Sequence, residues 1–437
     1  MMKINATTRR QVLAGLALLA TATPARAQGV LDATTLGLVP DSQADQSDIL
    51  QHALGQAADS GQVLRLPRGI IYAQGLDLPG GLVIEGVPGS TTISPFSGGM
   101  IGSIHEHSAL VLRDITFSGR GTAEGTSGLL SFEYADSIAL ERCVFRGAPG
   151  VAVNIVDAAV TIRDCEFGDI GDAAIHASDS RGLLISGNRI DGCGNAGIRI
   201  WRGERGPDGS IVTANRIANI DWRGGGNGQN GNGINVFNAD EVIVADNHIA
   251  DCAFTAVRLN TTNNTQVSGN TCLRSGEVAI FSEFEFSASV IANNIIDGAA
   301  TGISITNLDT GGQLAVCSGN IVRNITPTSA VNPDTIPIGI FAEAEAAITG
   351  NTVQGVPGIA IAAGYGTFLR NVLISANVVS ESDIGIGVSV VEGAGAVHIG
   401  GNAVVARQHA IVGLAWTDVI ETDLVANAIN YPNVSLG

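Results

Sequence analysis

One short phrase recurs along the chain: an apolar run, a fixed slot, and an aliphatic residue two positions after it. Asparagine fills the slot at Asn188, Asn215, Asn247, Asn270, Asn294, Asn320, Asn351, Asn377, Asn402 and Asn427, and earlier repeats place Ile115, Cys143 and Cys165 there. The slots are 22 to 32 residues apart. A period in this range that never holds constant is typical of a solenoid whose turns differ in loop length, and it is too short for repeats built of two helices.

Between slots, apolar and polar residues alternate, as at Ile185, Ile190, Ile198 and Ile200. A period of two is typical of β-strands, and Val and Ile favour strands. One coil cannot bury its apolar side, but stacked coils can when each strand pairs in parallel with its neighbours. We therefore predict an all-β fold, a right-handed parallel β-helix of about 13 coils. At ~4.8 Å per coil the rod would be roughly 60 Å long, with N-terminal turns added.

The slot residues are predicted to form an inward ladder at a bend. An asparagine amide can bond the backbone of a turn and tolerates left-handed backbone angles. Cys143 and Cys165 occupy consecutive slots and should therefore be stacked. The six cysteines have neither CxxC nor zinc-site spacing and fit buried small hydrophobic residues. A Cys143–Cys165 disulfide is the alternative in an oxidising compartment.

Residues 1–27 have the pattern of a targeting segment. Arg9 and Arg10 precede an apolar stretch, and Ala27 ends a small-x-small cleavage site. Paired arginines before a modest apolar run are typical of a bacterial twin-arginine signal, and an ordinary secretory signal is the alternative. Both predict a periplasmic or secreted protein, exported in the first case by the twin-arginine translocation machinery. No later apolar run approaches ~20 residues, so no transmembrane span is expected in the mature chain.

The chain is acidic, with a net charge of −18. Removal of the predicted signal, with Lys3, Arg9, Arg10 and Arg26, leaves 19 basic and 41 acidic residues and a net charge of −22. This balance argues against nucleic acid as a partner. It also repels anionic polysaccharide unless a local basic patch overrides it.

Residues 43–59 are predicted to form one amphipathic helix, with Asp45 or Ser47 as its N-cap. Such a helix would close the open N-terminal end of the solenoid, where core and strand edges are otherwise exposed. The predicted organisation is therefore a signal at 1–27, a cap with the first strands at 28–80, and the parallel β-helix at 81–437.

The strand Val63-Leu-Arg-Leu-Pro-Arg-Gly-Ile-Ile-Tyr72 follows the predicted helix and precedes the coils. This succession resembles pectate-lyase-like and polygalacturonase-like proteins. The whole chain more closely resembles a bacterial family of twin-arginine-translocated β-helix repeat proteins, and residues 221–236 and 277–286 carry that likeness. The resemblance implies the fold and export, and it implies no agreed activity.

Motifs of the better-known enzymes are missing. The Gly-His-Gly of polygalacturonases and the Asp-Pro-His-Asp of alginate epimerases do not occur, and Arg202-Gly-Glu-Arg205-Gly-Pro207 does not match the Arg-x-Pro-x-x-Arg of pectate lyases. No catalytic residue can therefore be transferred from those families, and the sequence identifies no cofactor.

Aligning the strand after each slot places its first and third residues inward and its second and fourth outward. The second-position stack is His176, Arg199, Asn235, Arg258, Phe281 and Ser304, and the fourth-position stack is Ser178, Trp201, Phe237, Asn260, Glu283 and Thr306. Excursions at 201–210 and 221–233 flank this face, as loops that form binding grooves do. After Asn320 the outward positions are Ala, Gly and Val, so those coils are predicted to be scaffold.

The face suits sugar chemistry. Trp201 and Phe237 can stack on a pyranose ring, while Arg199 and Arg258 can pair with a uronate carboxylate. That pairing would assist proton abstraction by Arg258 or His176; alternatively, Glu283 forms a hydrolase pair with Asp221 or Glu204. The candidate catalytic residues are Arg258, Glu283, Arg199 and Asp221, and the candidate substrate-binding residues are His176, Trp201, Arg202, Asn235, Phe237, Asn238 and Asn260.

Two functions follow from these observations. The first is an exported, pectate-lyase-like protein acting on polysaccharide as a lyase, epimerase or hydrolase. The second is a non-catalytic β-helix that binds glycan or envelope components, and a plain solvated surface is the remaining alternative. An enzyme needs Arg199, Arg258 and Glu283 to converge on one groove and not to be covered by loops. His105-Glu106-His107 lacks a third ligand, so no metal site is predicted.

Overall fold

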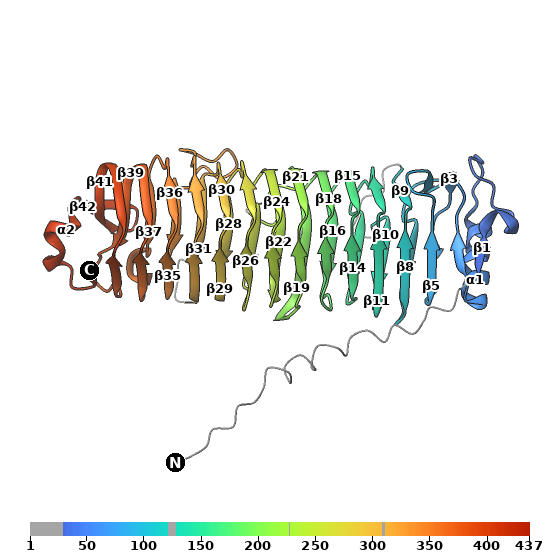
Figure 1. Cartoon of the computed structure of the whole chain (residues 1–437), viewed down its shortest axis with the longest axis horizontal. Coiled ribbons are helices and arrows are strands. Elements are labelled where there is room, and N and C mark those ends of the chain that lie inside the picture. The colour runs from blue at the N-terminus through green and yellow to red at the C-terminus, as the bar shows by residue number, and fades with distance from the viewer. Residues whose placement is uncertain (1–28, 121–127, 227, 308–310) are drawn as a thin grey trace, which may run out of the picture.

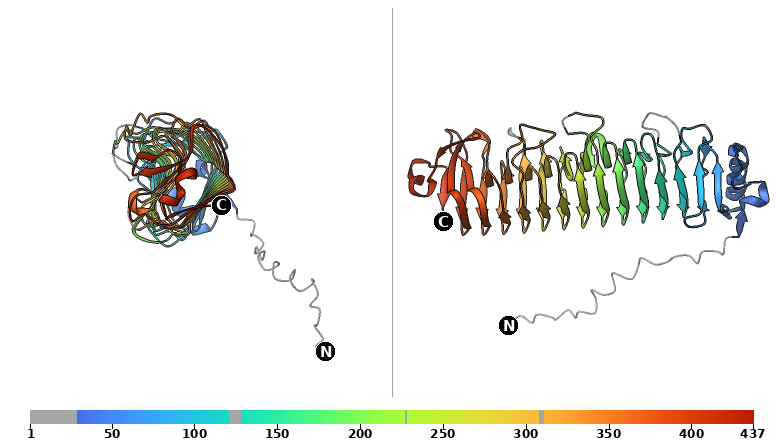
Figure 2. Two further views of the ribbon diagram at one scale, coloured as in Figure 1. Left: turned by 90° about the vertical axis from the view of Figure 1, so that its left-hand side faces the viewer. Right: turned by 90° about the horizontal axis from the view of Figure 1, so that it is seen from above.

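The computed structural model describes residues 29–120, 128–226, 228–307 and 311–437. The predicted signal at 1–27, including Arg9, Arg10 and Ala27, lies outside the described residues. The rest of the chain winds into a parallel β-solenoid of about 13 turns, which confirms the predicted fold class (Figure 1). Figure 2 shows the coils superimposed when the rod is viewed along its axis.

Each coil contributes strands to three faces, named A, B and C. Face A holds β1 (Val30–Asp32), β2 (Val63–Arg65), β5 (Leu82–Glu85), β8 (Ala109–Arg113), β11 (Ser137–Glu141), β14 (Val160–Arg163), β17 (Leu184–Ser186), β20 (Ile211–Thr213), β23 (Ile243–Ala245), β26 (Gln266–Ser268), β29 (Ser287–Ala292), β32 (Gln313–Ser318), β35 (Ala346–Thr349), β38 (Val372–Ser375), β40 (Val397–Gly400) and β43 (Val434–Leu436).

Face B holds β3 (Gly69–Tyr72), β6 (Thr91–Ser94), β9 (Thr116–Ser118), β12 (Val144–Arg146), β15 (Glu166–Ile170), β18 (Arg189–Cys193), β21 (Arg216–Ile220), β24 (His248–Cys252), β27 (Thr271–Leu273), β30 (Ile295–Asp297), β33 (Ile321–Arg323) and β36 (Thr352–Gln354).

Face C holds β4 (Leu76–Asp77), β7 (Gly102–Ile104), β10 (Leu130–Glu133), β13 (Val153–Val156), β16 (Ala173–Ser178), β19 (Ala196–Pro207), β22 (Asn232–Asp240), β25 (Val257–Asn260), β28 (Val278–Glu283), β31 (Thr301–Thr306), β34 (Ile338–Ala342) and β37 (Ile359–Ala363). The long strands β39 (Val378–Ser389) and β41 (Ala403–Ala415) continue both B and C, and β42 (Asp418–Glu421) pairs antiparallel with β41.

The interior is a set of stacked, like side chains. Phe117, Phe145 and Phe167 stack in successive coils with ring centroids 5.1 and 4.8 Å apart. Cys272 is fully buried between Ile249 and Ile296, as its place in the repeat predicts. Continuous burial of apolar side chains along the rod supplies the main favourable term in folding.

The slot asparagines form the predicted ladder. Asn188 Nδ2 donates to the Ile162 carbonyl of the preceding coil at 2.9 Å, and Asn215 Oδ1 accepts the Asn188 backbone N–H at 3.0 Å. Equivalent bonds repeat as far as Asn402. Each buried amide therefore satisfies backbone groups of two coils, which compensates for its desolvation.

Two details of the slot prediction are wrong. The left-handed backbone angle falls on the residue before the slot, as at Ala214 (φ 56°) and Asn293 (φ 58°), because the bend precedes the asparagine. Asn427 does not extend the ladder, since it lies in the short terminal helix α2 (Leu424–Asn427). The 3₁₀ turn η3 (Ala428–Asn430) follows that helix.

The two slot cysteines are stacked but not bonded to each other covalently. All six cysteines are free thiols, so the alternative of a Cys143–Cys165 disulfide is wrong. Cys165 Sγ accepts the backbone N–H of Cys143 at 3.3 Å, and the Cys165 N–H donates to Asn188 Oδ1 at 2.9 Å. The thiol therefore takes the acceptor role that an asparagine oxygen plays elsewhere in the ladder.

The N-terminal end is closed by η1 (Ala33–Leu36) and α1 (Ser47–Ser60) (Figure 1). The helix begins four residues later than predicted, because Asp45 accepts the N–H and hydroxyl of Ser47 in a turn. Gln46 is the N-cap residue, so neither Asp45 nor Ser47 caps the helix. Leu50, Ala53, Leu54 and Ala57 are buried against the first coils. None of the helices in the described residues is long and apolar enough to cross a membrane.

Candidate functional site

The outward positions of face C have the predicted register. His176, Arg199, Asn235, Arg258, Phe281 and Ser304 are paired in sequence from β16 to β31. The fourth positions from Ser178 to Thr306 are paired in the same coils. Adjacent strands in a sheet are about 4.8 Å apart, so each stack is a continuous column of side chains.

A cavity of about 480 Å³ opens on this face, hereafter the first cavity. Its lining is aromatic and amide-rich, with Trp201, Gly228, Gln229, Asn235, Phe237, Arg258, Asn260 and Phe284. Five of these residues were predicted at the site: Trp201, Asn235, Phe237, Arg258 and Asn260. A volume in this range, apolar walls and a few convergent polar groups are typical of small-ligand sites.

Aromatic rings form the accessible walls of the first cavity. Phe237 is 38% exposed and Phe284 is 49% exposed, although both are large apolar side chains. Trp201 lies edge-on to Phe237 at 6.4 Å, and its Nε1–H donates to Asn235 Oδ1 at 3.1 Å. This bond fixes the indole plane, so the rings are held in place before any ligand arrives.

Arg199 is not a free anion-binding group. It is 5% exposed, and its two terminal nitrogens each donate to Asp172 at 3.0 Å. Nη2 also donates to Asn230 Oδ1 at 2.9 Å. The expected pairing with a uronate carboxylate therefore lacks support in the geometry, because a protein carboxylate already holds the guanidinium.

Arg258 is occupied in the same way. Its Nε and Nη2 donate to the two oxygens of Glu283 at 2.5 and 2.8 Å, and Nη1 lies 3.6 Å from Glu277 Oε2. Arg258 is 7% exposed and Glu283 is 3% exposed. Asn260 Nδ2 also donates to Glu283 at 2.8 Å. The expected catalytic roles of Arg199, Arg258 and Glu283 stay predictions, and this pairing and burial argue against all three.

A covering loop, residues 221–226 and 228–231, lies over both arginines. Asn230 accepts from Arg199, and an added Cβ at Gly228 would lie 2.2 Å from Arg258 Nη1. The Trp222 ring packs on Phe254 at 5.1 Å, and Gly224 N–H donates to Asn195 Oδ1 at 2.6 Å. Because glycine has no side chain, the Gly- and Asn-rich sequence lets the backbone of the covering loop lie directly over Arg199 and Arg258.

Four other predicted residues lie outside the cavity lining. Asp221 pairs with Arg223 at 3.0 Å on the exposed side of the covering loop, and Glu204 is exposed on β19. Arg202 donates to the Ser180 carbonyl, and Asn238 donates to the Arg202 carbonyl. These contacts stabilise the irregular pairing that begins after Trp201 in β19. The 201–210 excursion is thus largely a bulged strand.

His176 packs edge-on against Trp201 at 5.3 Å, and its Nε2 contacts Ser178 Oγ at 3.2 Å. Burial, reinforced by the nearby Arg199 charge, lowers the pKa of His176 to about 4. The imidazole is therefore neutral at pH 7. It supports the indole from the side of the preceding coil and does not line the first cavity.

Gly228, Gln229 and Phe284 line the first cavity although the strand pattern did not predict them. Phe284 follows the end of β28 with φ 49°, so the strand alignment does not reach it. The signal that pointed to it was the segment 277–286, one of the two that carry the family resemblance. The other, 221–236, supplies Gly228, Gln229 and Asn235.

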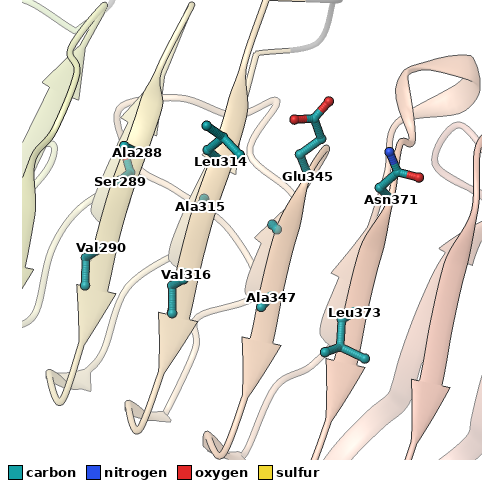
Figure 3. Close-up of a pocket in the computed structure, with 11 residues that line it drawn as sticks. Ala288, Ser289, Val290, Leu314, Ala315, Val316, Glu345, Ala347, Asn371 and Leu373 are labelled. Atoms are coloured by element: carbon teal, nitrogen blue, oxygen red, sulfur yellow. The ribbon is translucent and has the colours of Figure 1, made fainter.

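A shallow hollow of about 700 Å³ lies on face A (Figure 3). Val290, Val316, Ala347 and Leu373 form its floor in register, and Leu314 and Glu345 lie along its edge. It contains no aromatic ring and no convergent set of polar side chains. It is therefore a poorer ligand site than the first cavity.

The His105-Glu106-His107 segment has structural partners. His105 Nδ1 lies 3.1 Å from Glu133, and His107 Nδ1 lies 3.0 Å from Asp136. Within the described ranges, no group of three His, Cys, Asp or Glu side chains is arranged to hold a metal ion.

Comparisons with known proteins agree with the fold. Residues 103–231 and 149–315 match the family model described as a right handed beta helix region. A PL6 alginate lyase in complex with a trisaccharide is similar in structure, with 12% identity, a TM-score of 0.53, and coverage of 94% of this chain and 93% of that one. No curated protein matches the sequence.

Two further solved structures have lower TM-scores. The A-module of a mannuronan C-5 epimerase from Azotobacter vinelandii has 14% identity and a TM-score of 0.48, over 88% of this chain and 99% of that one. A DFA-IIIase from Arthrobacter chlorophenolicus A6 in complex with GF2 has 14% identity and a TM-score of 0.49, over 81% and 94%. At these identities the likeness shows the fold alone.

Proposed function

We propose that this protein is an exported β-helix that binds an uncharged glycan in the first cavity. The observation that carries the proposal is the set of aromatic rings and amide side chains that line the first cavity on face C. Trp201, Phe237 and Phe284 offer apolar surfaces to sugar ring faces, and Asn260 and Gln229 offer hydrogen-bonding groups to hydroxyls. Export, through the twin-arginine machinery to the periplasm or beyond, would bring this face to extracellular polysaccharide.

Charge supports an uncharged ligand. Arg258 is the charged residue in the lining, and Glu283 neutralises it. The whole sequence carries a net charge of −18, which repels polyanions. A uronate chain would therefore meet neither a free arginine nor a favourable field at this cavity.

The pairing pattern favours binding over catalysis at these residues. A lyase or epimerase mechanism through Arg199 and Arg258 requires guanidinium groups that can contact substrate, and both are held by carboxylates beneath the covering loop. A hydrolase pair requires Glu283 to reach substrate, but Glu283 is bonded to Arg258 and Asn260. Stable ion pairs and a pre-positioned indole instead form a rigid binding surface.

Titration calorimetry of the mature protein against neutral and uronate oligosaccharides tests the proposal. Removal of the Phe237 ring by Phe237→Ala should weaken binding of a neutral ligand about 2- to 10-fold, the range for one aromatic contact. Phe96→Ala is the matched control, because Phe96 is similarly exposed but lies outside the cavity. Equal loss in both variants, or no binding of any neutral glycan, would contradict the proposal.

A further inference from the structure

A second cavity of about 360 Å³ lies on face C, nearer the C-terminus. Its walls include four aromatic rings, with Phe281 from β28, Phe341 from β34, and Tyr365 and Trp416 from the turns after β37 and β41. Aliphatic side chains of β34, β37 and β41 complete its floor. The coils after Asn320 were predicted to be scaffold with outward Ala, Gly and Val, yet they supply three of these rings: Phe341 from an outward strand position, and Tyr365 and Trp416 from turns that the strand alignment does not reach.

The second cavity has an ordered wall. Asn332 Nδ2 donates to Glu277 Oε1 at 2.8 Å, Ser329 Oγ donates to the Gly276 carbonyl at 2.7 Å, and Thr301 Oγ1 donates to the Ile336 carbonyl at 2.8 Å. These bonds hold residues 329–336 against the turn before β28 and against β31, so the folded chain itself maintains the opening.

Trp416 is held in an unusual conformation at the cavity edge. Its φ is 57°, a left-handed angle that is uncommon and strained for a bulky residue. Tyr365 lies edge-on to the indole at 4.9 Å, and the absence of a side chain at Gly366 lets the indole approach that backbone closely. The indole is nevertheless 45% exposed. The fold thus holds a large apolar ring at the cavity edge without burying it in the hydrophobic core.

The two cavities meet at one charged cluster. Arg258 lines the first cavity, Glu277 lines the second, and Arg258 Nη1 lies 3.6 Å from Glu277 Oε2. Arg258 also lies over the ring of Phe281 at 5.1 Å. Phe281 and Phe284, only three residues apart, face the second and the first cavity respectively. The cavities are therefore neighbours along one face.

Charge restricts what the second cavity can hold. Its ionisable acidic groups are Glu277 and Asp334, and its lining contains no basic residue. Asp334 is exposed, whereas Glu277 is buried, and burial raises the pKa of the Glu277 carboxyl. A sugar ring that carries a carboxylate would meet acidic groups and no basic side chain there. An uncharged sugar ring could stack on Trp416 or Tyr365 and form hydrogen bonds with the Thr, Ser and Asn side chains of the lining.

We propose that the second cavity binds a further segment of the same uncharged glycan, so that one chain lies along the rod from Trp201 to Trp416. This inference rests on the proposed function of the first cavity. From β19 to β41, face C comprises eight successive strand pairings, a length of roughly 38 Å at ~4.8 Å each. The ligand is therefore a linear oligosaccharide or polysaccharide rather than a single sugar.

The test is calorimetry with a length series of one neutral oligosaccharide. Trp416→Ala should leave the affinity for the shortest ligands unchanged and weaken that for longer ligands about 2- to 10-fold. Tyr365→Ala, on the other side of the cavity, should give the same length dependence. Phe96→Ala is the exposed aromatic control, and thermal unfolding verifies that each variant is folded.

The outcomes separate the two proposals. If Phe237→Ala weakens binding at every length while Trp416→Ala and Tyr365→Ala match the wild type at every length, the second cavity is not a site and the first stands. If Phe237→Ala has no effect at any length, the proposed function itself is wrong. Equal weakening of short and long ligands by Trp416→Ala would contradict a single chain lying across both cavities.

Discussion

Arg258 and Glu283 are joined by two hydrogen bonds, of 2.5 and 2.8 Å, on adjacent strands beneath the covering loop. Both side chains were expected to face substrate, and both are almost fully buried. A buried guanidinium needs such a partner, because an unpaired charge in a low-dielectric region is strongly unfavourable. The pair therefore belongs to the framework of the site, and the rings and amides around it remain for a ligand.

Breaking this pair should reduce stability. Glu283→Gln leaves the Arg258 charge without its bidentate partner, and the free energy of unfolding in urea should fall by about 3 kcal/mol. Asp251→Asn, which breaks the exposed Asp251–Arg274 pair, should cost less than about 1 kcal/mol. Unchanged stability together with loss of glycan binding in Glu283→Gln would instead indicate that the carboxylate serves the ligand.

The covering loop should depend on the missing side chain at Gly228. A Cβ there would lie 2.2 Å from Arg258 Nη1, so Gly228→Ala must displace either the loop or the arginine. We expect a loss of about 1–3 kcal/mol in stability and weaker ligand binding. Gly225→Ala is the control, since Gly225 also has positive φ but nothing lies near its missing Cβ. Identical effects of the two substitutions would show that only backbone strain matters.

Each asparagine of the ladder should stabilise the fold by bonding the backbone of two coils. Asn247→Ala removes the acceptor for the Asn215 N–H and the donor to the Val212 carbonyl, both buried. We expect the free energy of unfolding to fall by about 2–4 kcal/mol. Cys165→Asn should be neutral or stabilising, because the asparagine oxygen can accept the Cys143 N–H that the thiol now accepts. A large loss of stability in Cys165→Asn would contradict this equivalence.

His176 should contribute to acid sensitivity. Its pKa is lowered from 6.5 to about 4, so the folded state resists protonation that the unfolded state allows. Its contribution is therefore complete above pH ~6.5 and is lost as the pH falls to about 4, with an upper bound of about 3 kcal/mol. Unfolding measured across this window should be less pH-dependent in His176→Gln. Titration near 6.5 of the resonance that is lost in His176→Gln would contradict the assignment.

The sequence specified the outward stacks because the asparagine phrase sets the register. Once Asn188, Asn215, Asn247 and Asn270 are aligned, strand alternation fixes which residues share a column. His176 to Ser304 and Ser178 to Thr306 accordingly have the pairing that the alignment predicts. Register is well determined wherever one side of a strand is buried, since a one-residue shift would exchange the two sides.

The ion pairing was not predictable from that alignment alone. Asp172, the partner of Arg199, lies in the turn before β16, and Glu277 lies in the turn before β28. Strand alternation says nothing about turn residues, whose side chains can reach the next coil. Trp416 and Phe284 were missed for the same reason. The end of the ladder was also missed, because the phrase at Asn427 has the right composition but lies in α2, before the final face A strand β43.

The central claim is that the first cavity takes an uncharged glycan because Asp172 and Glu283 already neutralise the arginines. The most direct measurement is the affinity of the mature protein for a neutral oligosaccharide and for a uronate oligosaccharide of the same length, each at low and high salt. We predict tighter binding of the neutral ligand, with little dependence on salt. Tighter binding of the uronate that weakens steeply as salt is added would contradict the account.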